Sequence, residues 1–126
     1  HRDEFSDTVA FRITGPARTM LFVPDIDRWD AHPGLLTRLL SGVDVAYVDG
    51  TFYDGSELPG RDLSEIPHPA MVTTMDLLTE HARMHPGSIR FIHLNHTNPV
   101  FQDRSLQRSI EQRGFGVSRV GERQPL

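Results

Sequence analysis

Three short apolar runs, each followed at once by polar side chains, constrain the fold of this chain more than any other feature. They occupy residues 19–27 (TMLFVPDID), 43–51 (VDVAYVDGT) and 91–101 (FIHLNHTNPVF). In open α/β sheets, ligands bind beyond the carboxyl ends of the strands, so a strand that ends in polar groups is typical of the floor of a site. The runs therefore predict a sheet that delivers polar side chains to one edge.

The segments between these runs predict helices. Residues 33–41 place leucines at helical spacing before Gly42, and residues 69–85 carry an apolar stripe with His68 at the N-cap. The stripe consists of Met71, Met75, Leu78 and Ala82. A strand, a helix and another strand form a right-handed unit whose strands are parallel. We expect two such units and an α/β fold.

The two ends of the chain predict further strands. Residues 8–14 alternate apolar and polar side chains, which is typical of a half-buried strand that pairs as a hairpin with the first apolar run. Asp103 is a suitable N-cap for a last helix, followed by a strand at residues 115–120. The polar tail at residues 121–126 is expected to be loosely held.

The 126 residues suffice for one domain, or for part of one. The formal net charge of −4 lacks the basic footprint of a nucleic-acid binder. No transmembrane run or signal peptide is present, so we expect a cytoplasmic protein that does not bind membranes. A first residue of His1 rather than Met indicates that the chain is processed or was cut from a longer one.

Without cysteine, any metal must be bound by His, Asp, Glu or Asn. Asp25, Asp49 and His93 each follow an apolar strand, and we expect them at one edge of the sheet. A carboxylate at such a position needs a cation, a donor or a proton, although an Asp-Gly pair is also a common turn. A neutral imidazole is a preferred transition-metal ligand, although an isolated buried histidine is more often structural.

Other polar residues near these strand ends are candidates for supporting roles. Asn95, His96 and Asn98 could orient ligands through hydrogen bonds, contact substrate, or stabilise the turn before Pro99. His68, at the expected start of a helix, could bind an anion or transfer a proton, or could simply cap the helix.

The segment at residues 50–67 has three glycines and two prolines and no sustained periodicity. Structureless connections of this length inside domains are usually functional. We therefore expect it to line the substrate pocket, with Tyr53, Glu57 and Arg61 as contributors.

Five motifs in this order resemble the second half of metallo-β-lactamase-fold proteins. The similarity is strongest to the pyrroloquinoline quinone biosynthesis protein B family and more distant to tRNase Z. The motifs are HRDEFSDTVAFRI, LFVPDIDRW, VDGTFYDGSELPGRD, IPHP and FIHLNHTNP. The resemblance implies that residues 1–126 form a partial domain, the C-terminal half of an αββα sandwich.

In that superfamily two metals lie at one edge of the sandwich. The resemblance implies that His1, Asp25 and His93 are metal ligands, with Asp25 bridging the two metals. It also implies that Asp49 and His68 assist proton transfer, so Asp49 is a relay partner rather than a ligand. The His-x-His-x-Asp-His motif, which supplies the other ligands in the family, does not occur in these residues.

The resemblance implies a metal-dependent hydrolase in which a metal-activated water attacks an ester or phosphoester of a small-molecule substrate. The expected cofactor is a divalent metal, zinc in the first place, with iron or manganese as alternatives. An iron-dependent oxygenase related to the quinone-biosynthesis protein is a second hypothesis, and a metal-free binding module is a third. A homo-oligomer is compatible with the sequence.

Overall fold

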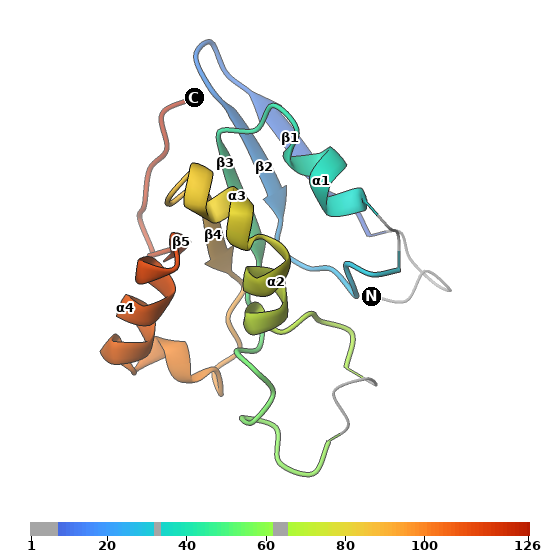
Figure 1. The fold of residues 1–126 in the computed structure, drawn as a ribbon, viewed down its shortest axis with the longest axis vertical. Coiled ribbons are helices and arrows are strands. Elements are labelled where there is room, and N and C mark those ends of the chain that lie inside the picture. The colour runs from blue at the N-terminus through green and yellow to red at the C-terminus, as the bar shows by residue number, and fades with distance from the viewer. Residues whose placement is uncertain (1–7, 32–33, 62–65) are drawn as a thin grey trace.

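The computed structural model describes residues 8–31, 34–61 and 66–126, and these residues form one five-stranded sheet with helices packed on it (Figure 1). The strands, in their order across the sheet, are β1 (Phe11–Thr14), β2 (Thr19–Val23), β3 (Val45–Asp49), β4 (Ile89–Ile92) and β5 (Phe115–Val117). Strand β1 pairs antiparallel with β2, and each later pair is parallel. The predicted hairpin and the parallel α/β sheet are confirmed.

The helical elements connect these strands. They are α1 (Leu35–Leu40), α2 (Met71–Leu77), α3 (Thr79–Met84), the short 3-10 helix η2 (Pro99–Phe101) and α4 (Arg104–Gln112). Figure 1 shows α2 and α3 crossing in front of the sheet, with α4 near β5. Asp103 caps α4 as predicted, because its carboxylate accepts hydrogen bonds from the backbone N–H groups of Ser105 and Leu106.

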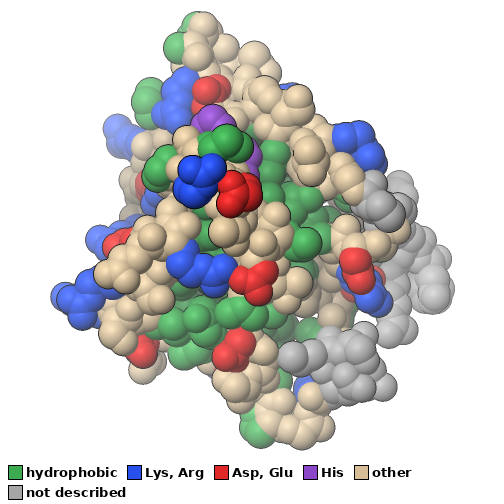
Figure 2. All heavy atoms as spheres, in the orientation of Figure 1, with side chains coloured by type: hydrophobic (Ala, Val, Ile, Leu, Met, Phe, Trp, Pro, Cys, Tyr) green, Lys and Arg blue, Asp and Glu red, His purple; other side chains and the backbone are tan. Residues whose placement is uncertain are grey.

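The core lies between the helices and one face of the sheet. Alternate residues of β2, β3 and β4 form that face and are at most 2% exposed: Leu21, Val23, Ala46, Val48, Ile89 and Phe91. Helical residues of the same buried cluster include Leu36, Leu40, Met71, Met75, Leu78, Ala82 and Ile110. The apolar stripe expected at residues 69–85 is thus fully buried. On the outer side of the helices, arginines and acidic side chains are interspersed (Figure 2).

The helix expected over residues 69–85 is two helices. Leu78 interrupts it with φ −108° and ψ 13°, and the hydroxyl of Thr79 donates a hydrogen bond to the carbonyl of Met75. A threonine hydroxyl that bonds to the carbonyl four residues earlier competes with the helical pattern and bends the helix. The N-cap of α2 is Ala70, so the placement of His68 at the N-cap was wrong.

Strand β1 is exposed along its length, so the expectation of a half-buried strand was wrong. Phe11 is 54% and Ile13 43% exposed. The helices pack on one face of the sheet, and the apolar residues of β1 lie on the other. Arg12 lies on the helix side, where its guanidinium donates hydrogen bonds to the carbonyls of Leu39 and Ser41 at the end of α1. The apolar residues on either side of Arg12 therefore point to the opposite face.

The C-terminal tail is anchored, contrary to the expectation of a loosely held segment. The Glu122 carboxylate forms an ion pair with Arg90 of β4 at 2.6 Å and accepts a hydrogen bond from the Tyr47 hydroxyl of β3 at 3.0 Å. Burial by itself raises the pKa of Glu122, but hydrogen bonds from Arg90 and from Gln124, Arg119 and Tyr47 outweigh it and lower the pKa. Composition alone could not reveal this, because the partners are distant in sequence.

Among the described residues, none of the helices has the length and apolar character that crossing a bilayer requires.

The lowered pKa of Glu122 predicts acid-sensitive stability. A carboxyl whose pKa falls on folding stabilises the protein above its ordinary pKa of 4.5, and this stabilisation is lost as the pH falls through the lowered value. We expect Glu122→Gln to reduce the free energy of unfolding at neutral pH by about 1.5–3 kcal/mol, and by much less near the lowered pKa. Urea unfolding between neutral and acidic pH measures this. Glu111→Gln, on the exposed side of α4, is the control; equal effects of the two variants would contradict the prediction.

Candidate metal centre

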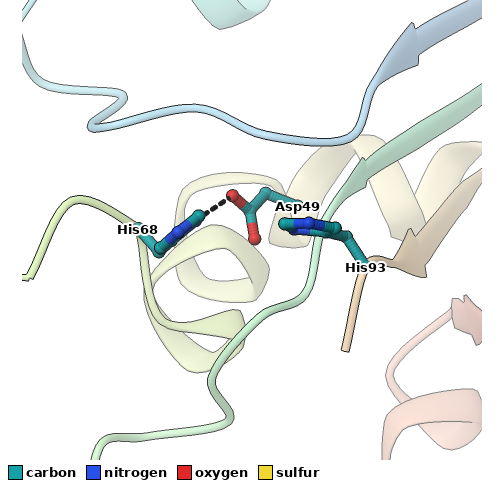
Figure 3. Close-up of side chains that lie close together, drawn as sticks. All are labelled: Asp49, His68 and His93. Atoms are coloured by element: carbon teal, nitrogen blue, oxygen red, sulfur yellow. Dashed lines mark hydrogen bonds and ion pairs between the residues drawn. The ribbon is translucent and has the colours of Figure 1, made fainter. Parts of the chain in front are cut away.

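The carboxyl ends of β2, β3 and β4 bring the polar residues that follow them to one edge of the sheet. Asp49 is the last residue of β3, His93 follows β4 directly, and Asp25 lies two residues beyond β2. Because the three strands are adjacent and parallel, their carboxyl ends meet at the same edge. His68 joins them from the segment before α2, and Figure 3 shows the side chains of Asp49, His68 and His93 converging.

The carboxylate of Asp49 is fully buried and accepts four hydrogen bonds. Oδ1 accepts from the backbone N–H of Thr51 at 2.8 Å and from its hydroxyl at 2.6 Å. Oδ2 accepts from the N–H of Ile26 at 3.1 Å and from Nδ1 of His68 at 2.7 Å. A carboxylate offers about four acceptor positions, so these donors use all of them.

His68 is held between two carboxylates. Its Nδ1 lies 2.7 Å from Asp49 Oδ2 and 3.6 Å from Asp25 Oδ1. The hydrogen bond to Asp49 raises the pKa of His68, burial opposes this, and the charges of Asp49 and Asp25 raise the pKa further. Because a carboxylate only accepts, Nδ1 carries the proton of the short bond, and Nε2 remains available to exchange a proton or bind a metal.

His93 has an unusual backbone conformation. Its φ of 59° makes it the one non-glycine residue with positive φ among the described residues. A non-glycine residue in the left-handed region costs about 1–3 kcal/mol and persists where surrounding structure enforces it, often at functional sites. This left-handed conformation turns the chain after β4. The exposed His93 ring lies with Nδ1 3.1 Å from the Thr51 hydroxyl.

Thr51 belongs to the site but was not among the residues predicted from the sequence. It is 6% exposed, and its Oγ1 lies within 3.2 Å of Asp49, His68 and His93. The available signal was its position two residues after a strand-end aspartate, but the Asp-Gly-Thr sequence is equally typical of a turn.

One group of side chains in the described residues has ligand atoms close enough to hold a metal. Asp49, His68 and His93 each offer an atom within 4.8 Å of the others. The hydrogen bonds of Asp49 argue against direct coordination by that residue, because a metal would have to displace a donor. Asp25 is partly exposed and lies beside His68, so it is better placed than Asp49 to bind a metal.

The remaining candidates are placed differently. His1 lies outside the described residues, and Arg61 is exposed. Asn98 is 2% exposed and donates to the carbonyls of Gly50 and Thr51, so it supports the loop after β3 from within the protein.

Asn95 and His96 stabilise the turn after β4. Asn95 Oδ1 accepts from the backbone N–H of His96, and its Nδ2 donates to the hydroxyl of Thr97. The exposed His96 lines a separate hollow formed with residues 97–99 and 102–105.

A hollow with mainly apolar walls opens beside His68. Its wall includes Phe52 and Ile66 from the long connection after β3, together with Trp29 and Leu77. Phe52 contacts the His68 ring edge-on, with ring centroids 6.0 Å apart. The connection therefore contributes residues to this hollow, and its role in binding a substrate stays a prediction.

The predicted contributors lie elsewhere. The Glu57 carboxylate accepts hydrogen bonds from the backbone N–H groups of Tyr53 and Gly55, which folds the connection onto itself. Tyr53 packs against the core cluster.

Because His93 has a positive φ, replacing it with glycine should destabilise the protein less than replacing it with alanine. Both His93→Gly and His93→Ala remove the imidazole, but only glycine adopts positive φ without cost. We expect the glycine variant to have a free energy of unfolding about 1 kcal/mol higher than the alanine variant. Urea denaturation followed by circular dichroism measures the difference. Ile92→Gly and Ile92→Ala, one residue earlier in β4, should show the opposite order; an alanine advantage at both positions would contradict the prediction.

Comparison with known proteins supports the resemblance inferred from the motifs. No family model matches the chain. Coenzyme PQQ synthesis protein B from Methylobacterium sp. (strain 4-46) is 29% identical over 124 residues, covering 94% of this chain and 40% of that protein. The protein of the same name from Cupriavidus necator is 26% identical over 129 residues, covering 96% and 41%. This chain therefore spans about two fifths of the relatives that it matches.

A solved structure agrees in fold. The crystal structure of Zn²⁺-bound PqqB from Methylobacterium extorquens aligns with a TM-score of 0.71 at 24% identity, covering 91% of this chain and 40% of that one. The predicted fold class is thereby confirmed. The chain has the α/β architecture of part of a metallo-β-lactamase-fold protein, and its sequence is similar over most of its length to coenzyme PQQ synthesis protein B.

Proposed function

We propose that these residues form part of the metal centre of a metal-dependent hydrolase acting on an ester or phosphoester. The observation that carries the proposal is the convergence of Asp25, His93 and the hydrogen-bonded pair Asp49–His68 at the carboxyl edge of the sheet. Because the chain spans about two fifths of its relatives, the activity of the whole protein is part of the proposal.

The donor chemistry fits a divalent metal. Imidazole nitrogens and carboxylate oxygens are ligands of zinc, iron and manganese. We assign Asp25 and His93 as ligands because both are partly or fully exposed at this edge, whereas the oxygens of Asp49 already accept four hydrogen bonds. His1 is a third proposed ligand, through the family resemblance. Zinc is the preferred metal, and the zinc-bound PqqB supports that choice.

A metal bound here would supply a water molecule whose pKa is lowered towards neutrality. His68 would exchange a proton at Nε2 with the attacking water or the leaving group. Asp49 would hold the opposite nitrogen in the protonated state and so keep the ring in one orientation. The hydrogen bond to Asp49 raises the pKa of His68, which favours a ring that can hold a proton and donate it to a leaving oxygen.

The hollow beside His68 is the proposed site of the substrate's apolar part. It has a volume of about 360 Å³, within the range of small-ligand sites. Its rim carries Asp27, Arg28 and Asp30, of which Arg28 and Asp30 are paired with each other at 2.9 Å. A substrate with an apolar group next to the bond to be cleaved would place that bond close to His68.

We expect variants of the proposed ligands and a variant of His68 to differ in the metal that they retain. In the protein purified at its natural length, Asp25→Ala and His93→Ala should lose bound metal, because each removes a ligand. His68→Gln should retain metal but hydrolyse bis-p-nitrophenyl phosphate about 100-fold more slowly, which is typical of lost acid-base catalysis. Native mass spectrometry reports the metal content, and nitrophenolate release reports turnover.

Asp103→Asn is the matched control, since Asp103 is the N-cap of α4 and asparagine also caps helices well. Unchanged metal content in both ligand variants would contradict the ligand assignment. A wild-type protein that takes up no zinc, manganese or iron would contradict the enzyme proposal altogether and favour a metal-free binding module.

A second candidate function is iron-dependent oxygenation of a peptide or quinone precursor. One observation favours it: the relatives are named for coenzyme PQQ synthesis. If this candidate is correct, activity on such a precursor should require both iron and dioxygen, and zinc should inhibit it. Oxygen-electrode assays of the iron- and zinc-loaded protein decide this, and turnover by the zinc form under nitrogen would contradict oxygenation.

A further inference from the structure

We infer that the Thr51 hydroxyl is a positioning group that fixes the tautomer and orientation of His93. The inference rests on the proposed function only where it concerns metal affinity. Its structural part follows from the hydrogen bonds around one oxygen atom. Thr51 Oγ1 lies 2.6 Å from Asp49 Oδ1, 3.1 Å from His93 Nδ1 and 3.2 Å from His68 Nδ1.

The single hydroxyl proton determines the direction of these bonds. A hydroxyl donates one hydrogen bond and accepts up to two, whereas a carboxylate only accepts. The shortest contact of Oγ1 is to Asp49, so the hydroxyl proton lies in that bond. Toward both histidines, Oγ1 can then act only as an acceptor.

His93 must therefore donate through Nδ1. In the neutral ring one nitrogen is a donor and the other an acceptor, so protonated Nδ1 leaves Nε2 with its lone pair. Metal-binding histidines commonly donate their second ring N–H to a nearby oxygen, which fixes the tautomer and the ring orientation. For His93, Thr51 provides that oxygen. His68 reaches the same tautomer independently, through its 2.7 Å bond to Asp49.

The position of the hydroxyl is itself fixed by the backbone. The N–H of Thr51 donates to Asp49, and its carbonyl accepts from the N–H of Asn95 and from the side chain of buried Asn98. Branching at Cβ further restricts χ1 of threonine. The loop after β3 is thus tied to the loop after β4, and Oγ1 is held between the two histidines.

A turn role alone does not account for these contacts. The bond from the Thr51 N–H to Asp49 forms a turn that almost any residue could complete. The hydroxyl contacts are different, because His68 and His93 lie 17 and 42 positions further along the chain. Only a side-chain oxygen at this position links all three groups.

The tautomer can be measured without metal or substrate. We would record long-range ¹H–¹⁵N NMR spectra of histidine-labelled, metal-free protein at about pH 9, well above the ordinary histidine pKa. His68→Gln and His93→Gln assign the signals. In the wild type, both rings should be protonated at Nδ1.

Thr51→Val removes the oxygen while keeping the shape. It should shift His93 towards the Nε2-protonated form and leave His68 unchanged, because Asp49 still accepts from His68. Thr51→Ser should keep the wild-type pattern. Thr51→Ala provides the same test if the valine variant does not fold.

Thr74→Val is the matched control, because Thr74 is a fully buried threonine whose hydroxyl accepts from the indole of Trp29 in the core. It should lower stability without altering either tautomer. Retention of the Nδ1-protonated His93 in both Thr51→Val and Thr51→Ala would overturn the inference, whatever reaction the protein catalyses.

Metal affinity provides the second measurement. Loss of a group that orients a metal ligand typically weakens binding about 10–100-fold. Competition with a zinc chelator should show that loss for Thr51→Val, with Thr51→Ser and Thr74→Val within a few-fold of wild type. If the tautomer shifts while affinity does not, the link to metal binding is wrong and the structural part stands. If the wild type binds no zinc, the proposed function fails independently of the tautomer result.

Discussion

The buried carboxylate of Asp49 is the interaction on which the arrangement of the site depends. Its four hydrogen bonds come from the segment after β2, the loop after β3 and the segment before α2. A buried carboxylate without donors would be strongly destabilising, so each of these segments must adopt a conformation that points a donor inward. The same requirement brings His68 next to Asp25 and holds the loop that carries Thr51.

The other half of the site depends on a sharp turn after β4. The positive φ of His93 is a local cost, and the loop hydrogen bonds made by Thr51, Asn95 and Asn98 offset it. Such strain suits a site that must hold a side chain in one orientation before a ligand arrives. The turn also brings the exposed imidazole of His93 to the Thr51 hydroxyl, which is itself bonded to the buried carboxylate of Asp49.

The fold could be predicted largely from the sequence, because strand-length apolar runs alternate with helical leucine and methionine patterns. The meeting of Asp25, Asp49 and His93 at one sheet edge also follows from parallel strands. Two of the errors have a common cause in contacts between distant residues. The exposure of β1 and the anchoring of the tail by Arg90 depend on what packs or bonds from elsewhere in the chain, which local periodicity does not encode. The break at Leu78 is local, because it accompanies the hydrogen bond from Thr79 to the carbonyl of Met75.

The order of the elements and the residue types at the strand ends follow from local pattern and chain connectivity, so both could be read from the sequence. Which of those residues touch depends on how the elements pack. In the folded protein the Thr51 hydroxyl lies between two histidines, and every acceptor position of Asp49 has a donor. Hydrogen-bond geometry between residues tens of positions apart is set by how strands and loops pack, and no spacing along the chain reports it.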